Sequence, residues 1–214
     1  MDIFSDNDQQ EYITLRSPYS DAEVQDIFKA VEQHEKPGID GKVLSVMLQM
    51  AYWCALKKGE LLAFRIKDVF DADGKPLKHV TVHKDQIAVP DELNSVLGAY
   101  WDYLNKLPKY KTGRLSPLFP DFKTGLTYVD HTFDRHIKTI CRKLKINPKI
   151  KSENIRQAGI CRYYASLKES RHTPDECLQT TVQFARRSEN QTIGILTDNI
   201  QPGGQRRTRP DWEE

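Results

Sequence analysis

The feature that most constrains the fold is an apolar stretch at residues 41–57. Apolar side chains occur there on every face of a helix rather than along one stripe: Val43, Leu44, Val46, Met47, Leu48, Met50, Ala51 and Trp53. A helix that is apolar all round has to be surrounded by other elements. The sequence therefore predicts one buried central helix, against which the rest of the chain packs.

The flanking segments alternate between helical and strand periodicity. Ser20 and Glu23 form the capping box S-D-A-E, which predicts a helix to about Gln33. Further helices are predicted at residues 58–63, 91–105, 127–144, 152–168 and 174–185. Alternating side chains predict strands at residues 64–69, 79–82 and 86–89. The expected fold class is α+β: a mostly helical single domain with a small three-stranded antiparallel sheet.

A chain of 214 residues fits one domain with tails. Residues 1–18 are polar and predict an acidic, flexible N-terminal arm, and residues 19–197 predict the folded domain. Residues 198–214 are rich in Gly, Pro and Arg and predict a flexible C-terminal tail. Trp212 in this tail is a candidate anchor for weak self-association.

The charge is distributed unevenly, although the net charge is only +2. The first forty residues hold about ten acidic against three basic side chains. Residues 135–187 hold about thirteen Lys or Arg against four acidic side chains. Such an excess predicts a surface that follows phosphates, and the alternative is an ordinary solvated helical surface.

Several classes of protein and site are disfavoured by composition. No apolar run approaches the roughly 20 residues of a membrane span, and the N-terminus lacks the pattern of a signal peptide, so we expect no membrane association and a cytoplasmic protein. The four cysteines are widely spaced and predict unpaired thiols in a reducing compartment. The histidines show no metal-binding spacing, so we expect neither a metal nor another cofactor.

One segment resembles a known enzyme family. Residues 56–69 read L-K-K-G-E-L-L-A-F-R-I-K-D-V. They resemble the first catalytic segment of the tyrosine recombinases, or phage integrases, usually read T-G-L-R-x-S-E-L-L-x-L-x-W-x-D-I. The positions in register are Glu60, Leu61, Leu62, Arg65 and Asp68.

Three later segments are similar to that family in the same order. Residues 118–120 resemble its L-F-P, residues 154–156 resemble the end of its H-x-L-R, and residues 182–188 resemble its L-L-G-H-S. The resemblance covers about residues 20–196 and implies the fold of a recombinase catalytic domain. It also implies a site in which arginines, a hairpin lysine and histidine-like residues surround a DNA phosphate that a tyrosine attacks.

The resemblance places five residues at degenerate catalytic positions. Lys57 stands for the first arginine, Lys84 for the hairpin lysine, Glu153 for the first histidine, Arg156 for the second arginine and Arg186 for the second histidine. Four of them have a structural alternative. Lys57 is then a solvated lysine at a helix end, Lys84 an ordinary turn residue, and Arg156 the partner of Glu153 in an internal ion pair.

The tyrosine nucleophile of the family falls near residues 195–196, where this chain has Ile195 and Leu196. No tyrosine follows Tyr164, and a threonine such as Thr192 or Thr197 is a poor substitute for a phenolate. We therefore assign no residue a catalytic role.

The favoured hypothesis is a non-catalytic DNA-binding protein, accessory to or regulating the integration or recombination of a mobile element. Its partners would be double-stranded DNA and a recombinase or transposition protein. The residues predicted to contact DNA are Lys57, Lys84, Arg156, Arg186 and Arg187.

Two alternatives stay open from the sequence. One is a protein-interaction module that has lost DNA binding. The other is an active integrase whose tyrosine is displaced, for example to Tyr110 or Tyr128, or is supplied by another subunit.

Overall fold

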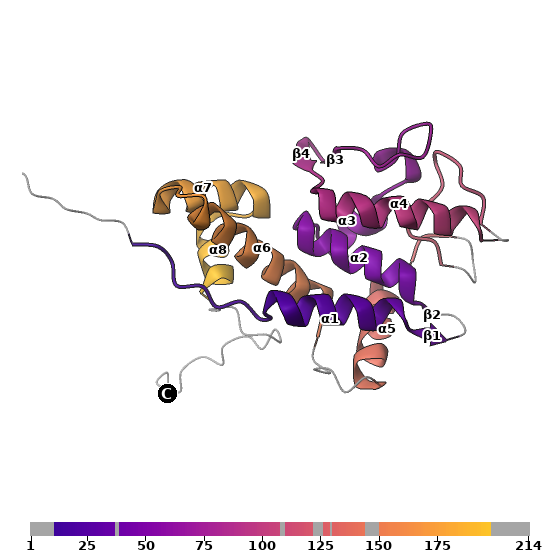
Figure 1. Cartoon of the computed structure of the whole chain (residues 1–214), viewed down its shortest axis with the longest axis horizontal. Coiled ribbons are helices and arrows are strands. Elements are labelled where there is room, and N and C mark those ends of the chain that lie inside the picture. Colours follow the sequence, from indigo (N-terminus) through magenta and orange to yellow (C-terminus); the bar gives the residue numbers. More distant parts are fainter. Residues whose placement is uncertain are drawn as a thin grey trace, which may run out of the picture.

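The chain folds into a mostly helical body with two small antiparallel hairpins (Figure 1). The structure is a computed structural model and describes residues 11–36, 39–107, 110–121, 126–128, 130–143 and 150–197. The helices are α1 (Asp21–Glu32), α2 (Gly41–Trp53), α3 (Lys58–Ala63), α4 (Asp91–Asn105), α5 (Asp130–Lys143), α6 (Ser152–Glu169), α7 (Pro174–Ala185) and α8 (Glu189–Leu196). None of these described helices is long and apolar enough to span a membrane.

Helix α2 lies at the centre, as its sequence predicts. It contacts α1, α3, α4 and α6, and its buried side chains come from all sides of the helix. Asp40 caps its N-terminus by accepting a hydrogen bond from the backbone N of Val43 at 2.9 Å. The helix ends at Trp53, four residues before its predicted end at about Lys57, because Ala55 takes a left-handed conformation with φ 49°.

Helix α1 begins where the capping box predicts. The Ser20 side chain accepts a hydrogen bond from the backbone N of Glu23, and Glu23 Oε2 accepts one from the backbone N of Ser20 at 2.8 Å. The apolar face of α1 packs against α2 and consists of Val24, Ile27, Phe28 and Val31. The prediction of this helix from its cap and its periodicity is confirmed.

The prediction of a three-stranded sheet is wrong. Strands β3 (His79–Val82) and β4 (Asp85–Ala88) form a two-stranded hairpin in which Val80 pairs with Ile87. Residues 64–69 form instead a single antiparallel bridge, from Arg65 to Pro117, and a short 3-10 helix, η1 (Ile66–Asp68), with backbone hydrogen bonds to residues 114–118. A further pair, β1 (Glu35–Lys36) and β2 (Ile39–Asp40), makes a second hairpin that the sequence pattern did not predict.

The strand-like alternation at residues 64–69 is accompanied by only one bridge of strand pairing, between Arg65 and Pro117. Phe64 and Ile66 are buried, and the intervening Arg65 is exposed. The backbone N of Arg65 donates to Asp68 Oδ2 at 2.8 Å, which turns the chain into η1. The burial pattern is therefore that of a strand, but after the single bridge the backbone turns into η1.

The C-terminal helices surround a second, smaller apolar cluster. Its buried members are Ala55, Ile160, Cys161, Tyr164, Cys177, Leu178, Ala185, Ile195 and Leu196. Helix α6 joins this cluster to the main core by crossing α2. A Cβ atom at Gly159 would lie 2.0 Å from the Tyr52 carbonyl oxygen, so the two helices touch backbone to backbone there.

Residues 11–16 of the predicted arm lie along the second cluster. The backbone N of Ile13 donates to the Tyr164 hydroxyl at 3.0 Å, and the backbone N of Arg16 donates to the Leu196 carbonyl at 2.8 Å. Ile13 and Leu15 pack against the buried members. Residues 1–10 and the predicted tail at 198–214, with its expected self-association, lie outside the described residues.

Candidate nucleic-acid interface

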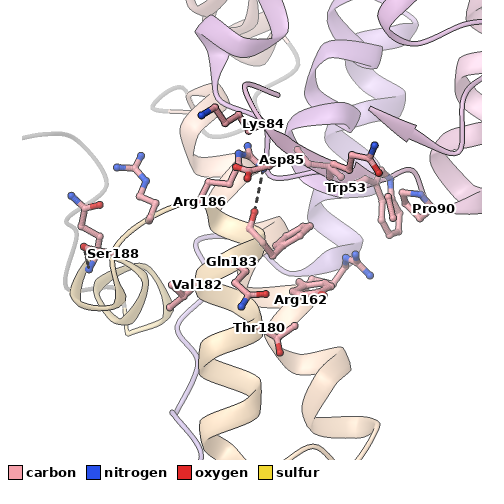
Figure 2. Close-up of a pocket in the computed structure, with 17 residues that line it drawn as sticks. Trp53, Lys84, Asp85, Pro90, Arg162, Thr180, Val182, Gln183, Arg186 and Ser188 are labelled. Atoms are coloured by element: carbon pink, nitrogen blue, oxygen red, sulfur yellow. Dashed lines mark hydrogen bonds between the residues drawn. The ribbon is translucent and has the colours of Figure 1, made fainter. Parts of the chain in front are cut away.

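A cleft of about 1170 Å³ separates the β3–β4 hairpin from α6 and α7 (Figure 2). Lys84 and Asp85 of the hairpin lie on one side, and side chains of α6, α7 and the α7–α8 turn lie on the other. Its lining includes the cationic Lys84, Arg162, Arg186 and Arg187, the acidic Asp85, and the aromatic Trp53, Tyr163 and Phe184. The lining residues themselves carry four positive charges against one negative charge, and two of the cations, Arg186 and Arg187, pair with carboxylates outside the lining. The excess makes the cleft electropositive.

Arg156 lies beneath the cleft in the protein interior. Its side chain is 1% exposed. Its Nε donates to the Ala55 carbonyl at 2.8 Å, Nη2 donates to the Ala185 carbonyl at 2.7 Å, and Nη1 donates to Glu153 Oε1 at 3.0 Å. Burial lowers the pKa of the Arg156 guanidinium, while the Glu153 carboxylate opposes that change. In this structure Arg156 joins the ends of α2 and α7, and it faces protein rather than solvent.

Arg186 is also held mainly by protein groups, at the edge of the cleft. Its side chain is 9% exposed. Its Nη2 donates to the Ala55 carbonyl and to Glu60 Oε2, both at 2.8 Å. Glu60 Oε2 also accepts from the backbone N of Lys57 at 2.7 Å, so one carboxylate anchors both the start of α3 and Arg186.

Two left-handed residues clarify how this chain compares with the recombinase motifs. Arg186 has φ 50° and ends α7, and Ala55 has φ 49° just after α2. Glycine is the usual residue in this conformation. Ala55 stands where the family segment T-G-L-R has its glycine. Arg186, which the resemblance places at the histidine of L-L-G-H-S, has the same left-handed conformation.

Glu153 connects the interior of the site to the cleft. Its Oε1 accepts from Arg156 and lies 3.3 Å from Nη2 of Arg187. The Glu153 and Arg187 side chains are 41% and 29% exposed, so this second pair is open to solvent. The ion pair between Glu153 and Arg156 is the structural alternative that the sequence left open. One carboxylate thus holds two guanidinium groups.

The two predicted lysines occupy different places. Lys84 is exposed at the turn of the β3–β4 hairpin, next to His83 with φ 56°, and it makes no ion pair with the described residues. Lys57 precedes α3, is half-buried and lies outside the cleft lining. The structure therefore brings Lys84, Arg186 and Arg187 to one cleft, with Arg156 below it and Lys57 outside it.

Sequence reasoning missed Arg162. This residue of α6 places its guanidinium 4.2 Å from the ring centre of Trp53 and 5.5 Å from that of Tyr52. Nearby, Tyr163 and Phe184 stack with ring centres 4.0 Å apart and planes at 21°. The sequence signal was the basic excess of residues 135–187, which includes Arg162 but does not distinguish it from its basic neighbours.

The buried donors of the cleft arginines have one further property in common. The Nε atoms of Arg162, Arg186 and Arg187 are buried, and each lacks a hydrogen-bond partner among the described residues. Unpaired donors on buried cations are costly and add to the positive potential of their surroundings. These atoms are themselves buried, so they act on a ligand in the cleft only through this potential.

The position of the family nucleophile is occupied by the buried apolar end of α8. Ile195 and Leu196 are buried, and the Thr192 hydroxyl donates to the Ser188 carbonyl at 3.0 Å. Burial raises the pKa of Tyr110 and of Tyr128 to about 12, and neither lines the cleft. Among the described tyrosines only Tyr163 lines it, and burial raises its pKa as well, partly offset by Arg162.

The described residues include no group of three His, Cys, Asp or Glu side chains arranged to hold a metal ion. Cys54 is buried, and its carbonyl accepts a hydrogen bond from Arg186. Its thiol donates weakly to the Ala88 carbonyl at 3.8 Å. Burial raises the pKa of its thiol to about 12, against the effect of Arg186 and Arg162. Cys54 does not line the cleft, and a thiol with a raised pKa is a weak nucleophile.

Comparison with known proteins identifies the fold. No family model matches the sequence, and no curated protein matches it. Among solved structures, the chain is similar to one described as "Crystal structure of XerA recombinase", with a TM-score of 0.62 and 16% sequence identity. The chain has a recombinase-like fold. The superposition covers 86% of this chain and 59% of that recombinase, so the chain spans about three fifths of its length.

Proposed function

We propose that this recombinase-like chain is a non-catalytic DNA-binding protein, accessory to or regulating the integration or recombination of a mobile element. The observation that carries the proposal is the electropositive cleft between the β3–β4 hairpin and α6–α7. Lys84 and Arg187 are open to solvent there and can reach phosphate oxygens. Phosphate contacts of this kind supply most of the affinity for DNA.

The non-catalytic part of the proposal rests on the state of the site residues. Phosphoryl transfer needs cationic donors aimed at the reacting phosphate and an activated nucleophile. Here the guanidinium groups of Arg156 and Arg186 are engaged mainly with backbone carbonyls and carboxylates. A carboxylate, Glu153, stands at a histidine position and repels phosphate. The nucleophile position at the end of α8 is buried and apolar.

A salt titration of duplex binding tests the proposal. Fluorescence anisotropy with a labelled duplex of about 30 base pairs would give the affinity between about 50 and 200 mM salt. Six neutralised phosphates would give a log–log slope of roughly −5. Affinity that is unmeasurable, or independent of salt, would favour the protein-interaction module.

Lys84→Ala makes the test specific to the cleft. It should weaken duplex binding several-fold and make the salt slope shallower by about one, because one phosphate contact is lost. The matched control is Lys29→Ala, which removes an exposed lysine from α1, away from the cleft lining. Equal effects of the two variants would show that binding is not centred on the cleft.

A cleavage assay tests the absence of catalysis. Incubation with nicked suicide substrates should yield no denaturant-stable protein–DNA adduct and no cut strand. An adduct would support the active-integrase alternative, and mapping the modified peptide would identify the tyrosine, with Tyr163 as the first residue to check.

A further inference from the structure

The cleft combines two kinds of recognition group that a DNA duplex would not use together. Cationic side chains occupy the hairpin turn and the α7–α8 turn, whereas Trp53, Tyr163 and Phe184 line the part formed by α2, α6 and α7. Phosphates pair with the first kind of group. Aromatic rings recognise the faces of bases, which a perfect duplex keeps covered by their neighbours.

We propose that this cleft binds an unpaired nucleotide, with its base on the Tyr163–Phe184 ring pair and its phosphate near Arg162, Arg187 and Lys84. This inference rests on the proposed DNA-binding function and names the form of DNA that the cleft selects. Such nucleotides occur in single strands and where a base leaves the stack of a distorted duplex.

The geometry of the aromatic pair supports stacking. Tyr163 of α6 and Phe184 of α7 are already parallel to within 21°, with ring centres 4.0 Å apart, and both are partly exposed. A base added to this pair would extend an existing stack, so little side-chain order would have to be created on binding.

The cation next to the ring pair is held in a suitable position. The Arg162 guanidinium lies over Trp53 at 4.2 Å from the ring centre, and no ion pair with a described residue neutralises it. An arginine that stacks through its face can still use the N–H groups at its edge, and because Nε of Arg162 is buried, its Nη groups are the ones that can reach a phosphate. Gln183 and Gln191 also line the cleft and can hydrogen-bond to the edge of a base.

The test compares three labelled DNAs of the same sequence: a single strand, a perfect duplex, and a duplex with one extrahelical nucleotide. At equal salt, the single strand and the bulged duplex should bind more tightly than the perfect duplex. Phe184→Leu keeps an apolar side chain but removes the ring, so it should weaken binding of those two DNAs roughly tenfold. It should change perfect-duplex binding by less than about twofold.

A second pair of variants keeps the test independent of any folding defect at Phe184. Tyr163→Leu should behave as Phe184→Leu does, whereas Tyr163→Phe, which keeps the ring, should bind like the unmodified protein. Tyr12→Leu removes an exposed tyrosine that lies outside the cleft, so it should leave the affinity for all three DNAs unchanged. Circular dichroism melts would confirm that each variant is folded.

A stacking signal completes the experiment. The fluorescence of 2-aminopurine at the unpaired position should fall on binding to the unmodified protein and fall much less with Tyr163→Leu. Equal affinity for all three DNAs, or leucine variants that bind single strands normally, would overturn this inference and leave salt-dependent duplex binding intact. Failure to bind any of the three would overturn both this inference and the proposed function.

Discussion

Two layers of cationic side chains lie at and below the cleft, and they differ in burial and in hydrogen-bond partners. The inner layer consists of Arg156 and Arg186, which are nearly fully buried and hydrogen-bonded to backbone carbonyls. The outer layer consists of Lys84, Arg162 and Arg187, which line the cleft and keep part of their surface open. The comparison shows that resemblance in residue type does not define a role, because the inner arginines stabilise the fold.

The role of the inner layer follows from where its hydrogen bonds end. Both guanidinium groups donate to the Ala55 carbonyl, which has left the α2 hydrogen-bond pattern. Arg156 also reaches Ala185 and Arg186 also reaches Glu60, so the layer joins α2, α3, α6 and α7. Buried cations are tolerated when they are paired in this way, and removing one member leaves the others unsatisfied.

The largest expected effect comes from Arg156→Ala. The free energy of unfolding should fall by about 3–5 kcal/mol, because two buried carbonyls lose their donor and Glu153 loses its buried partner. Urea unfolding followed by circular dichroism measures this loss. At a temperature where the variant is folded, duplex affinity should change less than twofold. A variant that melts normally but binds DNA weakly would break the distinction between the two layers.

Arg162→Ala should act in the opposite way. We expect a loss of duplex affinity of about fivefold, because one cation of the outer layer is removed. The stability loss should be below about 1 kcal/mol, the usual value of one partly exposed cation–π contact. Arg162→Lys keeps the charge and should recover most of the duplex affinity. A large stability loss with unchanged affinity would show that Arg162 stabilises the fold, as the arginines of the inner layer do, and does not contact DNA.

Glu153→Gln sharpens the comparison because Glu153 contacts both layers. The substitution removes the carboxylate that pairs with Arg187 and repels phosphate. Duplex affinity should therefore rise about threefold, equivalent to roughly 0.6 kcal/mol. Arg156 loses its counter-ion, so the melting temperature should fall slightly. Weaker DNA binding would indicate that Glu153 positions Arg187 rather than competing for it.

The smallest expected effect comes from Ala55→Gly. The left-handed backbone at Ala55 costs an L-residue about 1–2 kcal/mol relative to glycine. The substitution relieves this strain, but the stability that it gains is offset by the greater freedom of glycine in the unfolded chain and by the loss of a buried methyl group. The free energy of unfolding should therefore change by less than about 1 kcal/mol in urea titrations. A larger loss would mean that the Ala55 methyl group, and not only its carbonyl, holds the inner layer in place.

Features that depend on neighbouring residues could be predicted from the sequence. The α1 cap and the i, i+3 ion pair of Glu153 with Arg156 are both local, and both occur in the structure. Periodicity likewise predicted the helices from α1 to α7 to within a few residues. Helix α8 was not predicted, although Ser188 caps it, because it has only eight residues and a mixed composition.

Features that depend on distant partners could not be predicted. Residues 64–69 have the alternation of a strand, but their hydrogen bonds go to residues 114–118 across a long loop. The division of the cations into two layers depends on two carbonyls, those of Ala55 and Ala185, that lie at helix ends. Charge and spacing in the sequence do not show which arginine will be buried and will donate hydrogen bonds to those carbonyls.

The close approach of α6 to α2 at Gly159 has a consequence for local opening of the protein. The Tyr52 carbonyl that would lie 2.0 Å from a Cβ atom at Gly159 is three residues before Ala55, so main-chain contact sets the position of the inner layer. Residues 54–57 look like a loop, but they are enclosed by this contact and by the two arginines. Their amide hydrogens should therefore exchange with solvent at the slow rate of the α2–α6 unit rather than at the fast rate of a surface loop.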